Sequence, residues 1–208
     1  FSLYTWTIFL GVSLIFCSCD PAQPKYDSWL KTGGGNENLK YSSLHQIDTS
    51  NYNQLGVAWI YYSENKDSTK FGPMECNPIV VDGVMYGVSP KLKLFALNAA
   101  TGKELWTFNP ADSVANKKWH RNSVNMNRGV AYWANGNDKR IIYTVGSIVF
   151  SVNALTGSLV KSFGQEGGIN LVNGLDRNPD KLFVAPTSPV MVYKNLFFVS
   201  GLVGDETP

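Results

Sequence analysis

This chain contains two near-copies of one nine-residue phrase, and this repeat constrains the fold more than any other feature. Residues 98–106 read Asn-Ala-Ala-Thr-Gly-Lys-Glu-Leu-Trp, and residues 153–161 read Asn-Ala-Leu-Thr-Gly-Ser-Leu-Val-Lys. The two Thr-Gly pairs, at Thr101 and Thr156, are 55 positions apart. A repeat of roughly this length, built from short β-rich runs, is typical of the blades of a β-propeller.

A third, partial copy supports the repeat. The stretch after Pro189 resembles the stretch after Pro78, and the two prolines are 111 positions apart, which is about two periods. Within one period, Asp82-Gly83 is a strong signal for a two-residue hairpin turn, because both positions of that turn need positive φ. The runs that we expect to form the strands of the first repeat are residues 79–81, 84–88, 92–97 and 104–108.

These patterns predict an all-β fold, a β-propeller of four-stranded antiparallel blades of which two are nearly complete. Hairpins of this kind also build sandwiches and open meanders, so that alternative stays open. Propellers have typically 4 to 8 blades, and 208 residues hold only three incomplete ones. We therefore expect the chain to be the N-terminal part of a propeller, with Trp106 packing on a neighbouring blade. In the second copy Lys161 takes the place of that tryptophan.

The first residues are typical of a secretory signal. Residues 1–16 are apolar, carry no charge, and are followed by Cys17, Ser18 and Cys19. A small residue before Cys19 resembles a bacterial lipoprotein processing site. We expect residues 1–18 to be a signal peptide, residues 19–25 a lipoprotein tether, and 26–208 the propeller. The protein would then be periplasmic or in the cell envelope, anchored to a membrane by a lipid on Cys19. The alternative is an ordinary signal peptide cleaved nearby.

Charge and glycine patterns exclude some partners. The net charge is +2 with both signs scattered, which leaves no basic patch for nucleic acid. Gly33-Gly34-Gly35 predicts a turn rather than a phosphate loop, since no strand precedes it and no Gly-Lys-Ser/Thr follows. Asp48 or Thr49 could cap a short helix that runs through Leu55.

Together, the leading segment and the repeats resemble the pyrroloquinoline quinone (PQQ) dependent dehydrogenases, the quinoprotein glucose and alcohol dehydrogenases with an eight-bladed propeller. The resemblance covers residues 29 to 208. The matching pieces, in the family's order, are Trp29 with Gly33-Gly34, residues 41–47 (Tyr-Ser-Ser-Leu-His-Gln-Ile), 55–59 (Leu-Gly-Val-Ala-Trp), 75–83 (Glu-Cys-Asn-Pro-Ile-Val-Val-Asp-Gly), the phrase ending in Trp106, 127–132 (Asn-Arg-Gly-Val-Ala-Tyr) and 187–189 (Thr-Ser-Pro).

The resemblance implies roles for individual residues. Glu75 and Arg128 would contact PQQ, and we expect both side chains to face one cavity. The hydroxyl of Thr187 or Ser188 would also bind the cofactor, and Asp205 would help to hold a calcium ion. Arginine suits this ligand because a guanidinium forms a directional fork toward the oxygens of a tricarboxylate. Without the resemblance, Glu75 and Arg128 would be read as surface charges and Asp205 as a turn acid.

The family's function is then the leading hypothesis: an exported dehydrogenase that oxidises a sugar or alcohol and passes electrons to a membrane quinone or a cytochrome. The family's catalytic aspartate would lie beyond Pro208, so this chain alone should be inactive. The alcohol-oxidising branch has adjacent, disulfide-bonded cysteines before the arginine phrase. Here residues 122–126 read Asn-Ser-Val-Asn-Met, which favours the sugar-oxidising branch.

Two other hypotheses remain. A non-catalytic propeller lipoprotein could act as an envelope assembly scaffold, because a fold does not by itself decide a function. A carbohydrate-binding propeller could instead use Trp119, Tyr132 and Trp133 as stacking platforms, although core or blade-rim packing explains such residues equally well.

The lipoprotein hypothesis predicts a defined mature terminus. Processing should remove residues 1–18 and leave a lipid-modified Cys19, which mass spectrometry of the mature amino terminus would detect directly. A Cys19→Ser variant should lose the lipid mass and move from the membrane fraction to the soluble fraction. An intact Cys17, or an unmodified start further along the chain, would contradict the hypothesis.

Overall fold

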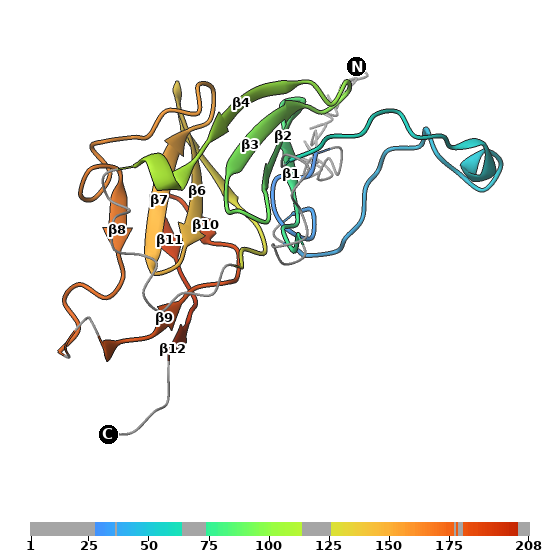
Figure 1. Cartoon of the computed structure of the whole chain (residues 1–208). Coiled ribbons are helices and arrows are strands. Elements are labelled where there is room, and N and C mark those ends of the chain that lie inside the picture. The colour runs from blue at the N-terminus through green and yellow to red at the C-terminus, as the bar shows by residue number, and fades with distance from the viewer. Residues whose placement is uncertain are drawn as a thin grey trace, which may run out of the picture.

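The protein consists of two antiparallel sheets that stand side by side, followed by two shorter strand pairs (Figure 1). The computed structural model describes residues 28–35, 37–63, 74–113, 126–176, 178 and 181–203. The residues predicted to form a signal peptide and a tether with Cys19 lie outside the described residues, as do Trp119 and Asp205.

The first sheet has four antiparallel strands in the order β1-β2-β3-β4. They are β1 (Ile79–Val81), β2 (Val84–Val88), β3 (Leu94–Asn98) and β4 (Glu104–Phe108). Asp82 and Gly83 join the first two strands with φ values of 50° and 76°. Positive φ at both central positions is what a tight hairpin of the I′ type requires. The hairpin predicted from Asp82-Gly83 is therefore confirmed.

The second sheet repeats this arrangement in the order β5-β6-β7-β8. Its strands are β5 (Ala131–Asn135), β6 (Asp138–Val145), β7 (Ile148–Asn153) and β8 (Gly168–Asn170). All three neighbouring pairs are antiparallel. The prediction of two nearly complete four-stranded antiparallel blades is thus confirmed.

The repeated phrase forms the same turn in both sheets. The side-chain oxygen of Asn98 accepts hydrogen bonds from the backbone N–H groups two and three residues later, at 3.1 and 3.0 Å. Asn153 does the same at 2.9 and 3.0 Å. Gly102 and Gly157 then adopt φ values of 68° and 72°, a conformation that costs glycine little. The turn is therefore specified locally by its asparagine and its glycine.

An indole group docks on each of these turns. Trp59 donates its Nε1–H to the carbonyl of Ala99 at 3.2 Å, and Trp106 donates to the carbonyl of Ala154 at 3.1 Å. Each ring lies over the glycine of the turn that it contacts: a Cβ added there would fall 2.5 Å from a Trp59 atom and 2.7 Å from a Trp106 atom. The predicted packing of Trp106 on a neighbouring blade is confirmed.

The two sheets share an apolar core. It combines residues of the first blade such as Ile79 and Leu94 with residues of the second such as Ile141 and Phe150, all of which are buried. Tyr86 crosses between the blades, because its hydroxyl donates to the carbonyl of Ala154 at 3.1 Å. Burial raises the pKa of Tyr86 to about 12, so this hydroxyl keeps its proton and remains a donor.

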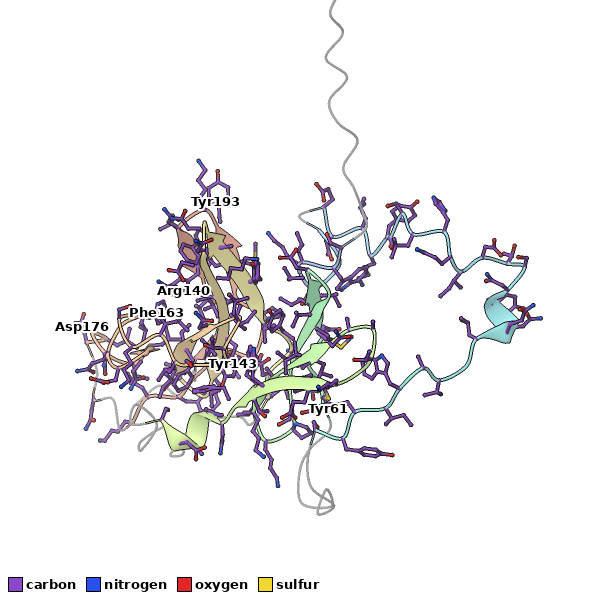
Figure 2. The ribbon with its side chains drawn as sticks, turned by 90° about the horizontal axis from the view of Figure 1, so that it is seen from above. Tyr61, Arg140, Tyr143, Phe163, Asp176 and Tyr193 are labelled. Carbon is purple, nitrogen blue, oxygen red and sulfur yellow. The ribbon has the colours of Figure 1, made fainter. Side chains whose placement is uncertain are left out.

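Aromatic contacts from the leading segment repeat those from β4. Tyr61, which is labelled in Figure 2, lies with its ring centroid 5.0 Å from that of Phe95 on β3. In the same way, the ring centroid of Phe108 on β4 lies 5.9 Å from that of Phe150 on β7. Phe95 and Phe150 are 55 positions apart, as the turns are. The segment that ends the leading arm therefore packs on the first blade in the way that β4 packs on the second.

The third, partial repeat is a hairpin of β10 (Met191–Tyr193) and β11 (Leu196–Phe198). It packs beside β5, where a second buried cluster contains Ala131, Val149 and Val190. A separate antiparallel pair joins β9 (Val184–Ala185) to β12 (Leu202–Val203).

The second copy of the phrase departs from the first after its glycine. Beyond Gly157, Leu159 makes one isolated bridge to Val152, and the chain then makes a detour through Gly164 and Gly167 before β8 begins. Both glycines have positive φ, 57° and 89°. The fourth strand of this blade therefore comes from a later segment than the repeat alone predicts.

The leading segment runs as an extended arm away from the sheets (Figure 1). The glycine turn is confirmed, since Gly33 and Gly34 have φ values of 89° and 98°. The short helix is present only as a 3₁₀ turn, η1 (Tyr52–Gln54), and its predicted cap is wrong. The side chain of Asp48 accepts instead from the N–H and hydroxyl of Ser50, at 2.7 and 2.6 Å, so it is not available to the helix.

A second 3₁₀ turn, η3 (Pro110–Asp112), follows β4. The side chain of Asn109 caps it by accepting a hydrogen bond from the N–H of Ala111 at 3.2 Å. No helix among the described residues has the length and apolar character needed to cross a membrane.

The indole contact leads to a stability prediction for the full-length protein. Trp106→Ala should destabilise the fold by about 3 kcal/mol, the lower end for loss of a large aromatic from a core, because this ring is only partly buried. Trp106→Phe keeps much of the ring contact and loses the N–H donor, so it should cost about 1 kcal/mol. Chemical denaturation midpoints would measure both. Leu105→Ala is the control on the same strand, since Leu105 is exposed. Equal midpoints for the two Trp106 variants would contradict the assignment.

Candidate cofactor site

Three equivalent segments meet at the candidate site, each leading into the first strand of a repeat. Glu75 precedes β1, Arg128 precedes β5 and Thr187 precedes β10. Backbone hydrogen bonds join them in sequence. The N–H of Asn77 donates to the carbonyl of Arg128 at 3.0 Å, and the N–H of Arg128 donates to the carbonyl of Thr187 at 3.0 Å. The repeat therefore brings together residues that are more than fifty positions apart.

The guanidinium of Arg128 lies between the other two side chains. Its Nε is 3.4 Å from Oε2 of Glu75, and its Nη1 is 3.5 Å from Oγ1 of Thr187. The side chains of Arg128 and Glu75 are 50% and 33% exposed. An ion pair this long and this accessible contributes little to stability. It does hold a forked cation in place at the surface of the site, where a ligand can reach it.

The structure places some of the predicted site residues together and others apart. Glu75, Arg128 and Thr187 come together, whereas Ser188 lines a separate cavity of about 540 Å³ with Lys31 and Tyr132. Of the two neighbouring hydroxyls, Thr187 is the one within hydrogen-bond distance of the guanidinium. Asp205 and Cys19 lie outside the described residues. Within the described ranges, no three His, Cys, Asp or Glu side chains gather as a metal site would require.

Sequence reasoning missed the residues that hold Arg128 in place. Asn77 donates a second hydrogen bond, from its side chain, to the carbonyl of Arg128 at 3.2 Å. A Cβ on Gly129 would fall 2.9 Å from Cγ of Pro189 and 3.1 Å from Oγ1 of Thr32, so only glycine fits there without a shift. The sequence could have indicated both residues, because Asn77 and Gly129 belong to the matching phrases at 75–83 and 127–132.

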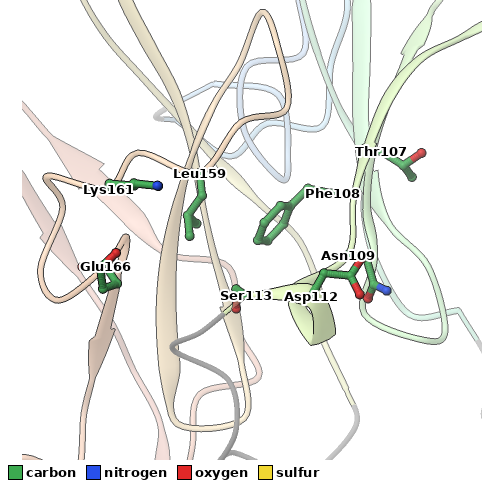
Figure 3. A pocket seen from close by; sticks show the side chains of 8 residues that line it. All are labelled: Thr107, Phe108, Asn109, Asp112, Ser113, Leu159, Lys161 and Glu166. Atoms are coloured by element: carbon green, nitrogen blue, oxygen red, sulfur yellow. The ribbon is translucent and has the colours of Figure 1, made fainter.

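A second cavity, of about 360 Å³, lies between the two blades, where β4 and η3 approach the segment after the second turn (Figure 3). Phe108 of β4 forms one wall, and Leu159, Lys161 and Glu166 line it from the segment after the second turn. Lys161, which replaces the repeated tryptophan, therefore lines this cavity. None of the three clustered site residues borders it.

Two of the three aromatic residues proposed as sugar platforms, Tyr132 and Trp133, have packing roles, whereas Trp119 lies outside the described residues. Trp133 donates its Nε1–H to the carbonyl of Lys194 at 2.9 Å, and the guanidinium of Arg140 lies 5.1 Å from the Trp133 ring centroid. Tyr132 packs against the core between the blades. Arg140 and Tyr193 lie toward the same end of these strands in Figure 2. These contacts favour the blade-rim interpretation of Trp133 and Tyr132.

Comparison with known proteins identifies the family. Residues 29–208 match the family described as PQQ: glucose/ethanol/alcohol dehydrogenase, beta-propeller domain. The chain belongs to this family. Its two four-stranded sheets are therefore propeller blades, as the repeat predicted.

Similar proteins come from several bacteria. The chain is 34% identical over 135 residues to quinohemoprotein alcohol dehydrogenase ADH IIB of Pseudomonas putida, covering 64% of this chain and 18% of the relative. It is 28% identical over 193 residues to quinoprotein glucose dehydrogenase of Escherichia coli (strain K12), covering 86% and 24%. The crystal structure of quinohemoprotein alcohol dehydrogenase from Comamonas testosteroni shares the fold, with a TM-score of 0.66, 24% identity, and coverage of 86% and 24%. The chain thus spans about a quarter or less of these relatives.

Cys76 directly follows Glu75, and its partly buried side chain packs against the apolar core of the blades. Its Sγ accepts a hydrogen bond from the N–H of Val88 at 3.2 Å. Burial raises the pKa of Cys76 to about 11, while the hydrogen bond from Val88 acts in the opposite direction. The thiolate is the reactive form of cysteine, so this position should be inert in the folded protein at neutral pH.

This burial leads to a prediction about reactivity. At pH 8, iodoacetamide should alkylate Cys76 about a hundredfold more slowly in the native protein than after unfolding, because a pKa near 11 instead of 9 reduces the thiolate fraction by that factor. Peptide mapping would follow the Cys76 peptide separately from other cysteines. The native rate should rise as the pH approaches 11. Equal rates in the native and unfolded protein would show that the thiol is accessible and not perturbed.

Proposed function

We propose that this chain forms part of the PQQ site of a dehydrogenase that oxidises a hydroxyl group of an alcohol or sugar. The observation that carries the proposal is the position of the Arg128 guanidinium between Glu75 and Thr187. Membership of a PQQ dehydrogenase family and the names of the relatives, which include alcohol and glucose dehydrogenases, support it.

The donor set fits the chemistry of the cofactor. PQQ is a planar tricarboxylate with adjacent carbonyl groups, so it presents many acceptor oxygens. A guanidinium has five N–H donors, and those not directed at Glu75 and Thr187 remain to bind carboxylate or carbonyl oxygens. The Thr187 hydroxyl can donate one more hydrogen bond. Glu75 orients the guanidinium and can accept a proton or a hydrogen bond near the ring.

The cofactor supplies the redox chemistry when it is bound, by accepting a hydride equivalent from the substrate carbon. The described residues of this chain bind and orient. Arg128 neutralises part of the negative charge of the ligand, and the backbone hydrogen bonds to Asn77 and Thr187 keep its position fixed. The residue that removes the substrate proton would lie beyond Pro208, and a calcium ion would need ligands in addition to Asp205.

The setting of the enzyme is part of the same proposal. Export through residues 1–18 and a lipid on Cys19 would place the protein in the periplasm or cell envelope, beside a membrane. Electrons would then pass to a membrane quinone or to a cytochrome. The apolar stretch before Cys19 supports this placement.

Substitution of Arg128 tests the cofactor assignment in the full-length protein. Arg128→Ala should weaken PQQ binding by about 1.5 to 3 kcal/mol, the scale of hydrogen bonds to a charged group. Arg128→Lys keeps the charge but loses the fork, so it should recover only part of the affinity. Titration with PQQ, followed by absorbance or fluorescence, would measure the dissociation constants.

Arg140→Ala is the matched control. This arginine also has an acidic partner, with Nε 2.8 Å from Oδ1 of Asp138, but it lies on β6 at the blade rim. Its loss should leave PQQ affinity unchanged. If Arg128→Ala and Glu75→Gln both bound PQQ as the wild type does, the cofactor site would be disproved, and the scaffold hypothesis would become the better one.

A further inference from the structure

We infer that a buried pair of polar residues, Asn127 and Thr144, positions Arg128 for cofactor binding. The two side chains lie next to each other inside the second blade, where they are 4% and 1% exposed. Buried polar groups destabilise a fold unless they are hydrogen-bonded. The inference rests on the proposed function, because it assigns a role toward the same cofactor.

Both side chains of this pair are hydrogen-bonded within the protein. Asn127 donates from Nδ2 to the carbonyl of Thr144 at 3.0 Å and lies 3.5 Å from its hydroxyl. The side-chain oxygen of Asn127 accepts from the N–H of Gly129 at 2.9 Å. Asn127 therefore bridges from β6 to the residue on the far side of Arg128, so that Arg128 is enclosed in a short side-chain-to-backbone turn.

Thr144 extends the same network to the third segment of the site. Its hydroxyl donates to the carbonyl of Pro186 at 3.1 Å, directly before Thr187. Thr144, near the carboxyl end of β6, thus holds both the Arg128 turn and the Thr187 segment. The N–H of Arg128 bonds to the carbonyl of Thr187 between these two attachments, at 3.0 Å.

The consequence concerns the freedom of the guanidinium. The side chain of Asn127 bonds to Thr144 and to the N–H of Gly129, so the residues on both sides of Arg128 are held. The N–H and carbonyl of Arg128 are also hydrogen-bonded, so the backbone that carries its side chain is fixed. Only the side-chain torsions remain to be set by Glu75 and Thr187. A cation held in advance loses less conformational entropy when a ligand binds than one that must first be ordered.

The first blade shows that the fold itself does not need this hydroxyl. By the strand pairing, Thr144 faces Val149 on β7, and the corresponding pair in the first blade is Val88 facing Leu94 on β3. Val88 is also 1% exposed. A valine therefore fills the same place in a sheet of the same kind. Thr144 occurs in the second blade, and the segment that leads into this blade carries Arg128.

Thr144→Val is the test, because it removes the hydroxyl while keeping the shape and the strand preference. In the full-length protein it should weaken PQQ binding about fivefold, which is the value of one hydrogen bond. Thr144→Ser retains the hydroxyl and should restore wild-type affinity. Thermal unfolding of each variant would establish that the folded protein is being titrated.

A double-mutant cycle separates positioning from general damage. If Thr144 acts through Arg128, Thr144→Val should change PQQ affinity less than about twofold in an Arg128→Ala background. An equal loss in both backgrounds, or no loss in the wild-type background, would overturn the inference while leaving the proposed cofactor site intact. Wild-type affinity in Arg128→Ala alone would overturn both.

Discussion

The architecture depends on the contact between an indole and the turn of the next blade. An asparagine and a left-handed glycine shape each turn, and together they present a bare backbone surface and an outward carbonyl. Trp59 and Trp106 use that surface in the same way. The contact of Trp106 joins the first blade to the second, and the apolar core between the two sheets holds them together over a larger area.

The candidate site follows from that relation. When equivalent blades stand side by side, the segments that lead into their first strands become neighbours, and the backbone bonds from Asn77 to Arg128 and from Arg128 to Thr187 join them. Each repeat then contributes one different side chain to a shared place: a carboxylate, a guanidinium and a hydroxyl. A scaffold of repeated units thereby builds a site of mixed chemistry.

Local features of the sequence were the predictable ones. Asp82-Gly83 and the Asn98 turn depend on residues within a few positions, and the repeat placed Glu75 near Arg128. The resemblance supplied their roles. The wrong or missed predictions concerned side chains with competing partners, or partners far apart in the sequence. Asp48 had a nearer partner in Ser50, and the bond from Asn127 to Thr144 spans 17 positions and reaches a backbone carbonyl, which no residue type reveals.

The direction of the indole contact has a consequence for synthesis of the chain. Each tryptophan reaches a turn that comes later, 40 residues on for Trp59 and 48 for Trp106. As the chain extends, the first blade can pair its strands before the turn at Ala154, on which Trp106 rests, has been made. The first blade therefore waits for the second before Trp106 secures it, and contacts of this sequence separation form more slowly than local ones. The first blade should then become fully secured only after the strands and turn of the second have formed.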